Sequence, residues 1–396
     1  MKKIMILGAS IYQLPAIIKA KEMGLYTIAV SRAGDYPGFA VADKSYYIDA
    51  ADGDKVLEIA KKENIDAITT ICTDFPMRTV AKVASNLGLP GISEKAAFNA
   101  TDKIAMRFCL QQNNVPIPKF RVANNLDEFL NSIKDFSNKC VIKAPDNSGS
   151  KGIKMLDDSS DIQKAIEAYN YCFKFSKSGM ILIEEFMDGP EVCVETLNYK
   201  GVCYPIQVTD QLKKMPPYFT DAGYSQPTLL SNETRKKIEE VAIAANIALE
   251  NFNGSSCTEI IVTKEGPKVV EVGPRLAGDC MTTHLVPLST GVDMVENVIN
   301  IALGNEINIS KTLNKGSCIR YYLKPVIGTI KDIQGVEEAK SLKGVQDVVL
   351  LKHPGDEAVE LRSSADRIAY VISQADNAED AISLCENALN KIEVIV

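Results

Sequence analysis

The sequence contains only two histidines, His284 and His353, and its ten cysteines include no Cys-x-x-Cys pair. A histidine-rich metal centre and a cysteine-based zinc site are therefore excluded. Cysteines scattered in this way indicate thiols in a reducing compartment, not a disulfide framework. Both histidines are interpreted as structural residues.

Long apolar runs are also missing. The N-terminal stretch has a basic start but only four apolar residues before Gly8, too few for a signal peptide. No run approaches the length of a membrane span. The net charge of −7 argues against nucleic acid or an anionic membrane as a main partner. We therefore expect a cytoplasmic protein with neither kind of partner.

The chain of 396 residues, 46% of them hydrophobic and 24% charged, is long enough for two to four domains. Its first part alternates apolar strands with helical patterns, which indicates a parallel α/β unit. Leu89-Pro-Gly91 breaks this alternation and gives the first domain boundary. The expected strands are residues 4–7, 27–30, 46–48 and 67–71.

Gly8 follows the first strand, at a turn where a nucleotide could bind. The dinucleotide fingerprint is incomplete, because Ser10 and Gln13 stand where its other glycines belong. The second strand ends in Ser31-Arg32 and offers no acid for a ribose hydroxyl, which argues against a nicotinamide enzyme. The loop Thr73–Phe75 lies where small ligands usually bind such sheets, although a simple helix cap explains it equally well.

Residues 257–279 form the most informative segment. Two short strands, 258–263 and 268–272, flank a turn and predict a hairpin. Each strand carries one carboxylate, Glu259 or Glu271, and an odd-length loop would place these directly opposite each other. Facing acids repel each other, and a hard cation such as Mg²⁺ would relieve the repulsion. An exposed hairpin with two unrelated acids is the alternative. If the loop has an odd number of residues, Ile261 pairs with Val269 and Ile260 pairs with Val270.

The middle of the chain holds candidate phosphate contacts. Lys103 begins a helix, and Lys143 lies in the strand 140–144. The loop 145–152 can turn backbone N–H groups toward a phosphate, but an isolated Gly/Ser loop is more often just a hairpin loop. Its candidate contacts are Ser148, Gly149, Ser150 and Gly152.

Acids also end the strand before residue 186. Glu184 and Glu185 close that strand, and Glu191 opens the next one after a Gly-Pro turn. Such acids are usually exposed strand ends, but they could accept hydrogen bonds from a base and a ribose. An amphipathic helix over 231–252 with a cap at Asn253-Gly254 follows. Beyond residue 311 we expect a separate small α+β module without assignable chemistry.

Taken together, these pieces resemble the ATP-grasp superfamily of carboxylate–amine and carboxylate–thiol ligases over nearly the whole chain. The resemblance implies an N-terminal Rossmann-like pre-grasp domain (1–92), an ATP-grasp domain (93–310, lobes about 115–185 and 186–310) and a C-terminal α+β module (311–396). It also implies ATP and Mg²⁺, with Mn²⁺ as a substitute. It assigns Lys103, Lys143 and the loop 146–152 to the phosphates, Glu184, Glu185, Phe186 and Met187 to adenine, Glu191 to ribose, Glu259 and Glu271 to the metal, and Arg275 to the phosphoryl or carboxylate group.

One position departs from the family pattern. The family often has Glu-x-Asn, with Asn as a further metal ligand, whereas this chain reads Glu271-Val-Gly273. The following Pro-Arg-Leu-Ala-Gly-Asp and the tail are similar to the branch of L-amino-acid (dipeptide) ligases. Purine-pathway members of the glycinamide-ribonucleotide synthetase type, a biotin-carboxylase type and a non-catalytic ATP-binding protein stay open as alternatives.

The mechanism implied by the resemblance is phosphoryl transfer from ATP to a carboxylate, followed by attack of an amine on the acyl phosphate. No nucleophilic side chain is needed, in keeping with the absence of a credible Ser-His or Cys-His pair. The expected partners are a small-molecule carboxylate and amine. The identity of both substrates and the oligomeric state are left open, with a homodimer among the options.

Overall fold

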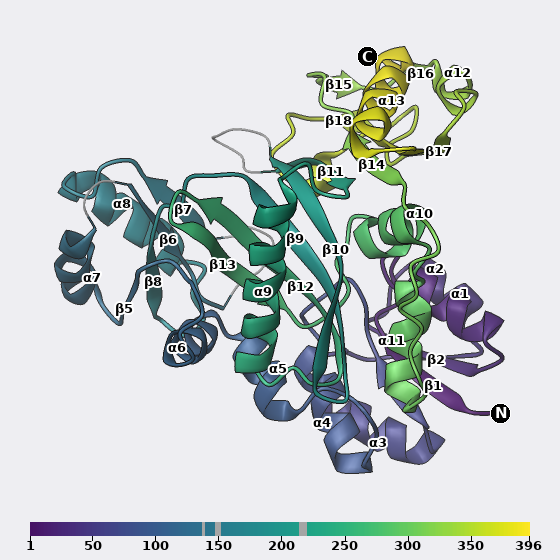
Figure 1. The fold of residues 1–396 in the computed structure, drawn as a ribbon, viewed down its shortest axis with the longest axis horizontal. Helices are drawn as coiled ribbons and strands as arrows, with labels where there is room; N and C mark the ends of the chain where they lie inside the picture. The colour runs from purple at the N-terminus through teal and green to yellow at the C-terminus, as the bar shows by residue number, and fades with distance from the viewer. Residues whose placement is uncertain (137–138, 147–151, 214–219) are drawn as a thin grey trace.

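The structure is a computed structural model that describes residues 1–396 except 137–138, 147–151 and 214–219. Three main sheets follow one another across the molecule, with the N-terminal domain and the small lobe at opposite ends (Figure 1). The mixture of a parallel α/β unit with antiparallel lobes confirms the fold class expected from the sequence. In the described part of the chain, no helix is long and apolar enough to cross a membrane.

The N-terminal domain is a parallel four-stranded sheet in the order β3-β2-β1-β4. One face packs on α1 and on α11 from the large lobe, so the two units share a hydrophobic core. Capping explains the helix limits: Asp52 accepts from the Lys55 N–H at the start of α3, and Gly88 closes α4 in the left-handed region. The elements are β1 (Lys3–Leu7), α1 (Leu14–Glu22), β2 (Tyr26–Ser31), α2 (Pro37–Val41), β3 (Lys44–Tyr47), α3 (Gly53–Glu63), β4 (Ala67–Thr69) and α4 (Met77–Leu87).

The turn after β1 differs from a nucleotide-binding turn. Gly8 has φ +103°, and the side chain of Gln13 fills the space beside it, 2.6 Å from where a Cβ would lie. Gln13 is itself fixed, since its Nε2 donates to the Ile71 carbonyl at 2.8 Å. The glycine therefore makes room for a buried glutamine of the chain.

Two helices lead into the small lobe, an antiparallel sheet in the order β5-β8-β6-β7 covered by α7 and α8. Ser93 and Asp102 cap the two linking helices through bonds to the N–H groups of Ala96 and Ala105. The elements are α5 (Glu94–Thr101), α6 (Lys103–Gln112), β5 (Phe120–Ala123), α7 (Leu126–Ser132), β6 (Cys140–Lys143), β7 (Ile153–Leu156), α8 (Ile162–Phe173) and β8 (Ile181–Glu185).

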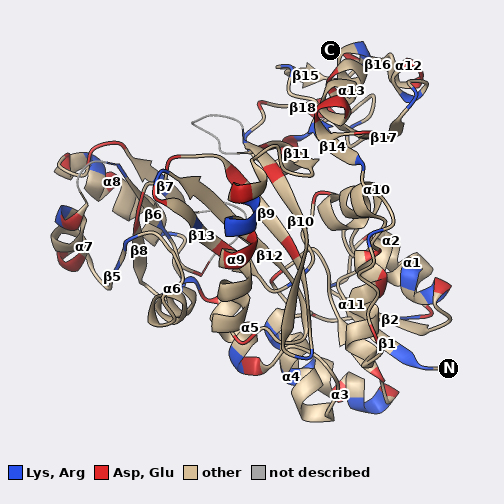
Figure 2. Cartoon of the chain, in the orientation of Figure 1, with Lys and Arg blue, Asp and Glu red and all other residues tan. Residues whose placement is uncertain are grey.

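The large lobe is built on an eight-stranded antiparallel sheet, β13-β12-β9-β10-β11-β14-β19-β17. Helix α9 packs on β12 and β13, and its second half carries no charged side chain, whereas its first turns carry charges of both signs (Figure 2). The helix ends at Ala248, earlier than expected, and Phe252 is exposed. The elements are β9 (Glu191–Tyr199), β10 (Val202–Lys213), β11 (Asp221–Gln226), α9 (Asn232–Ala248), β12 (Gly254–Thr263), β13 (Gly266–Gly273), α10 (Val286–Thr290) and α11 (Met294–Leu303).

The tail continues the same sheet, so its strands extend the large lobe. Strand β14 pairs with β11 of the large lobe, because a fully buried strand needs partners for its backbone N–H and C=O groups. Helix α13 covers the added strands. The elements are β14 (Gly316–Tyr321), β15 (Gly328–Thr329), β16 (Asp332–Gln334), α12 (Val336–Lys340), β17 (Val345–Leu350), β18 (Glu357–Ala358), β19 (Ala369–Ala375), α13 (Ala378–Lys391) and β20 (Glu393–Ile395).

Candidate active site

Glu259 of β12 and Glu271 of β13 are paired directly across the hairpin, as the sequence predicted. The remaining pairing was predicted wrongly: Ile260 lies opposite Val269, and Ile261 lies opposite Lys268. Thr263 pairs with Gly266, so the loop has two residues and a β-bulge absorbs the extra residue next to Glu259. The bulge thus brings the two acids face to face despite an even-length loop.

The pKa values of the two facing carboxylates are shifted in opposite directions. Burial, together with the charge of Glu271, raises the pKa of Glu259 to about 7. Burial acts on Glu271 in the same direction, but Lys103 outweighs it and lowers the pKa of Glu271, since Lys103 Nζ lies 2.8 Å from Glu271 Oε1. Lys103 is the first residue of α6, whose cap at Asp102 fixes where the lysine emerges.

Lys143 of β6 is held by a buried acid. Its Nζ lies 2.6 Å from Oε2 of Glu184, whose other oxygen accepts from Nε of Arg107 at 2.5 Å. Burial alone would raise the pKa of Glu184, but Arg107 and Lys143 lower it to about 2. Arg107 also donates to the Val270 carbonyl at 2.6 Å, which ties α6 to the large-lobe hairpin.

The remaining acids expected at the nucleotide also have lysine partners. Glu185 Oε1 lies 2.7 Å from Nζ of Lys268, and Glu191 Oε1 lies 2.5 Å from Nζ of Lys213. The first pair joins the last residue of β8 to β13, and the second joins β9 to β10. The Glu185–Lys268 pair therefore joins the two lobes, and each of the two acids lies beside a cation.

Arg275 follows the hairpin and reaches the N-terminal domain. Its Nη2 lies 3.1 Å from Oδ2 of Asp74, in the loop after β4. A Cβ placed on Gly273 would lie 2.8 Å from the Cζ of Arg275, so the guanidinium occupies the space in which a side chain at 273 would project. The departure from the family pattern at Gly273 thus makes room for Arg275.

Glu195 lies beneath this site and was not expected. It is completely buried on β9, in register with Cys257, and neither carboxylate oxygen has a hydrogen-bond partner among the described residues. Burial raises the pKa of Glu195 to about 8, although Arg275 acts in the opposite direction. A sequence signal for Glu195 was available, because side chains alternate along a strand and residue 195 therefore shares the sheet face of Glu191.

The structure brings Lys103, Lys143, Glu184, Glu259 and Glu271 together around the hairpin and α6. Phe186 and Met187 follow β8 and are half-buried, and the Gly152 carbonyl accepts from the Ala144 N–H at 2.8 Å. Ser148, Gly149 and Ser150 lie outside the described residues.

Sequence analysis did not predict two cationic residues of the site, Arg107 and Lys213. Arg107 lies four residues after Lys103, on the same side of α6, and this spacing was the available signal. Lys213 lies at the end of β10 with no motif around it, so only the sheet pairing reveals it.

The residues fit a phosphate-bound magnesium ion better than a metal held by protein alone. Across the described ranges, no group of three or more His, Cys, Asp or Glu side chains is arranged to hold a metal. Two facing carboxylates can supply part of an oxygen shell, with phosphates and water supplying the rest, as Mg²⁺ prefers. Lys103 and Lys143 each pair with an acid of the site, and lysine ammonium groups are suited to phosphate oxygens.

A Rossmann-like domain followed by two β lobes, with facing acids and lysines between them, defines a nucleotide-clasping ligase. Residues 136–283 match the family model of the ATP-grasp domain, and residues 320–396 match that of the L-amino acid ligase C-terminal domain 2. The chain therefore carries an ATP-grasp domain and is a carboxylate–amine ligase that forms C–N bonds with ATP. Enzymes with an ATP-grasp domain generally use ATP and Mg²⁺.

Individual relatives come from two branches. The chain is 25% identical to the alanine–anticapsin ligase of Bacillus amyloliquefaciens, over 76% of the chain and 70% of that protein. It is 24% identical to the formate-dependent phosphoribosylglycinamide formyltransferase of Bacillus subtilis strain 168, over 99% of the chain and 98% of that protein. In fold it is similar to an L-amino acid ligase from Bacillus licheniformis, with a TM-score of 0.85, 22% identity, and coverage of 100% and 98% of the two chains.

Proposed function

We propose that this enzyme joins the carboxylate of one amino acid to the amine of another through an acyl phosphate. The observation that carries the proposal is the pair of facing acids, Glu259 and Glu271. Lys103 is bound to Glu271, and the charges of Lys143, Lys213 and Arg275 also act on the pair. The choice of amino acids is supported by the C-terminal domain, whose family model is that of L-amino acid ligases.

We assign the nucleotide contacts by position. Lys103, Lys143 and the loop residues Ser148, Gly149, Ser150 and Gly152 bind the phosphates. Glu185, Phe186 and Met187 meet the adenine, and Glu191 meets the ribose. Glu184 takes a different role from the expected adenine contact, because Arg107 and Lys143 occupy both of its oxygens. It holds Lys143 in place through an ion pair.

Glu259 and Glu271 are the proposed metal ligands. Mg²⁺ held there would supply positive charge to the phosphoryl oxygens during transfer, and Mn²⁺, with the same preference for oxygen, is proposed as a substitute. Glu271 would have to exchange Lys103 for the metal, which frees the lysine for a phosphate oxygen. Arg275 would then neutralise charge on the phosphoryl or carboxylate group.

The reaction has two steps. An oxygen of the substrate carboxylate attacks the γ-phosphorus of ATP, an O–P bond forms, and the bond to ADP breaks. The amine nitrogen of the second substrate then attacks the acyl carbon, a C–N bond forms, phosphate leaves with the electron pair of the broken C–O bond, and the nitrogen loses a proton. The cations lower the barrier by stabilising charge on the transferring group.

Domain limits and setting are proposed as well. The division 1–92, 93–310 and 311–396 is supported by the separate N-terminal and small-lobe sheets, although the third part extends the large-lobe sheet.

A cytoplasmic location is supported by ten cysteines that are all free. A homodimer stays an expectation that light scattering would test against a chain mass of 43.2 kDa.

A second candidate is a purine-pathway activity. It is supported by the formate-dependent phosphoribosylglycinamide formyltransferase, because the match spans 99% of this chain and 98% of that protein. It would use the same ATP site on a phosphorylated ribose derivative. The amino-acid and ribosyl substrates differ in chemistry, so one assay with both classes of substrate separates the two functions.

The test is phosphate release from Mg-ATP with amino acids singly and in pairs, with phosphoribosylamine plus glycine, and with phosphoribosylglycinamide plus formate. Release that requires an amino-acid pair and is lost in Glu271→Ala establishes the amino-acid ligase. Release only with a ribosyl substrate overturns it in favour of the purine reaction. ATP binding without release anywhere would indicate a non-catalytic binding protein.

A further inference from the structure

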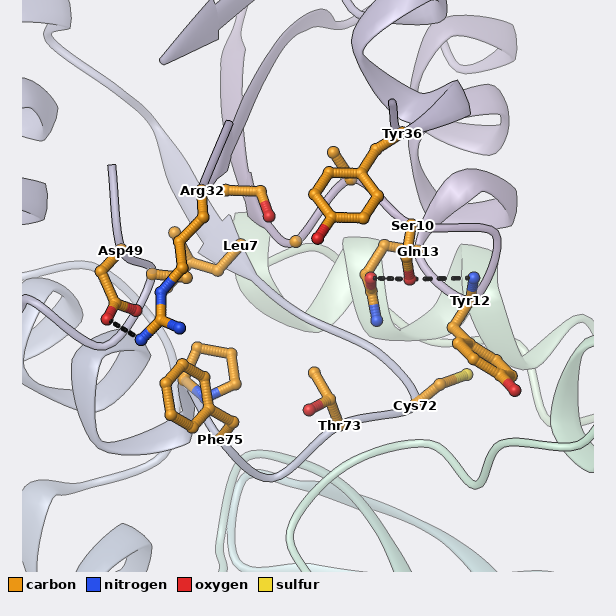
Figure 3. A pocket seen from close by; sticks show the side chains of 15 residues that line it. Leu7, Ser10, Tyr12, Gln13, Arg32, Tyr36, Asp49, Cys72, Thr73 and Phe75 are labelled. Atoms are coloured by element: carbon orange, nitrogen blue, oxygen red, sulfur yellow. Dashed lines mark hydrogen bonds and ion pairs between the residues drawn. The ribbon is translucent and has the colours of Figure 1, made fainter. Parts of the chain in front are cut away.

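A cleft opens at the carboxyl ends of β1, β2 and β4 in the N-terminal domain (Figure 3). Its volume is about 410 Å³, in the range of small-molecule sites, and this end of a parallel α/β sheet is where ligands bind. We call it the strand-end cleft. It is lined by residues of the four loops Leu7–Gln13, Ser31–Tyr36, Asp49–Ala50 and Cys72–Pro76.

Aromatic side chains form much of its wall. Tyr12, Tyr36 and Phe75 are 48%, 36% and 59% exposed, and they come from three different loops (Figure 3). Large rings that stay exposed around a cleft are typical of binding surfaces, because a ligand removes their apolar area from water. The walls therefore suit an aromatic or large apolar group.

One charged pair lies among these rings. Arg32 Nη2 lies 2.5 Å from Oδ2 of Asp49, and the Arg32 guanidinium lies 5.9 Å from the centre of the Phe75 ring. An exposed pair of this kind contributes little stability, so Arg32 can turn to a ligand at small cost. The planar fork of its guanidinium matches the two oxygens of a carboxylate.

A phosphorylated ligand fits the cleft poorly. Among the described residues that line it, Arg32 and Asp49 are the only charged side chains, and their charges cancel. The Gly8 turn, which could otherwise cradle a phosphate, is filled by Gln13. A carboxylate with an apolar side chain needs no excess of positive charge.

The floor of the cleft is joined to the reaction site. The Cys72 N–H donates to the Leu276 carbonyl at 3.0 Å, and the Cys72 thiol donates to the Ala277 carbonyl at 3.3 Å. Two residues further on, Asp74 holds Arg275. A ligand in the strand-end cleft would thus lie beside the segment that carries Arg275.

We propose that the strand-end cleft binds the amine substrate, and that this substrate is an amino acid or short peptide with an aromatic or large apolar side chain. The inference rests on the proposed amino-acid ligase function. Phe75, Tyr12 and Tyr36 hold the side chain, and Arg32 holds the carboxylate. The free amine then lies toward Arg275, where its nitrogen displaces phosphate from the acyl group and releases a proton.

The test separates the two half-reactions. Hydroxylamine traps an acyl phosphate as a hydroxamate without any amine substrate, so the twenty amino acids are first screened singly as carboxylate donors with Mg-ATP. With the best donor, KM and kcat are then measured for L-phenylalanine, glycine and phenethylamine as amines. Phenethylamine has the ring but lacks the carboxylate that Arg32 would hold.

We expect KM for L-phenylalanine to be at least about tenfold below that for glycine, which corresponds to burial of a phenyl group. Phe75→Ala should raise KM for L-phenylalanine about tenfold or more. Arg32→Gln should make L-phenylalanine no better than phenethylamine. Both variants should keep the wild-type rate of hydroxamate formation.

Two control variants match these changes outside the cleft. Phe98→Ala removes an exposed ring with an arginine over it, since Arg78 lies 4.7 Å from its centre. Arg121→Gln removes an exposed arginine paired with an aspartate, Asp135. Both should behave as wild type.

Unchanged KM values in Phe75→Ala and Arg32→Gln would overturn the inference. So would a loss of hydroxamate formation in those variants, which would assign the cleft to the carboxylate donor. If the wild-type enzyme forms no hydroxamate from any amino acid, the proposed function itself fails, and the inference fails with it.

Discussion

Arg107 and Glu184 form a buried ion pair with 2.5 Å between Nε and Oε1, and both side chains are only 3% exposed. The two residues come from α6 and from β8 of the small lobe, and Arg107 also donates to the hairpin of the large lobe. One guanidinium therefore connects both lobes and holds, through Glu184, the lysine proposed to bind phosphate.

Removing Arg107 should cost far more stability than removing an exposed arginine. In Arg107→Met, Glu184 loses one of its two cations inside the protein, and we expect a loss of about 3–5 kcal/mol in the free energy of unfolding. Arg121→Met breaks an exposed pair of the same type and should cost about 0–1 kcal/mol. Urea unfolding of both variants measures the difference, and similar losses would contradict the buried network.

The same network predicts a dependence of stability on acid pH. The pKa of Glu184 is lowered to about 2 in the folded enzyme, from a usual value near 4.5. A lowered pKa gives stability that is fully present above the unfolded pKa and is lost as pH falls toward the folded pKa. The stability gap between wild type and Glu184→Gln should thus be constant above about pH 5 and shrink below about pH 4.5.

Urea midpoints of both proteins at pH 6, 5, 4 and 3.5 would measure this gap. A gap that does not change between pH 6 and pH 3.5 would show that Glu184 is not held ionised by Arg107 and Lys143.

Loss of either facing acid should abolish turnover. Glu259→Ala and Glu271→Ala each remove half of the proposed metal shell, and metal stabilisation of several kcal/mol corresponds to a fall in kcat of about 100-fold or more. Glu265→Ala, in the turn of the same hairpin, is an exposed control and should leave kcat unchanged. The kcat values of the three variants are compared by phosphate release, with the substrates that the assay on the wild-type enzyme identifies. An active Glu271→Ala variant would contradict the role of Glu271 as a metal ligand.

A side chain at position 273 should disturb Arg275. In Gly273→Ala the new methyl group would lie 2.8 Å from the Arg275 Cζ, so the guanidinium must shift, which disturbs its bond to Asp74. We expect kcat to fall about tenfold or more, as for loss of one charge-stabilising donor, with ATP affinity unchanged. Gly278→Ala, five residues later, has its nearest neighbour at 3.9 Å and serves as the control. Equal activity of the two variants would contradict the placement of Arg275.

The sequence predicted local features well where they depend on spacing. Lys103 at a helix start, Lys143 in a strand, and acids in each arm of a hairpin were all placed correctly, because side-chain period and capping act over a few residues. The facing of Glu259 and Glu271 was also predicted correctly. The loop length that was expected to produce this pairing was wrong, because the loop has two residues and a β-bulge restores the register. The residues around this bulge give no local sequence signal for it.

Only the tertiary structure decided which residues meet across the chain. Arg107 reaches Glu184, and Arg275 reaches Asp74, over separations that no local pattern encodes. The same holds for the tail, whose strand β14 pairs with β11. It also holds for the strand-end cleft, which four loops enclose. By itself the sequence determined the elements and the kinds of side chain they carry, because these follow from local backbone preference and periodicity. The active site required the fold, because its charges are stable and useful only when distant segments are packed together.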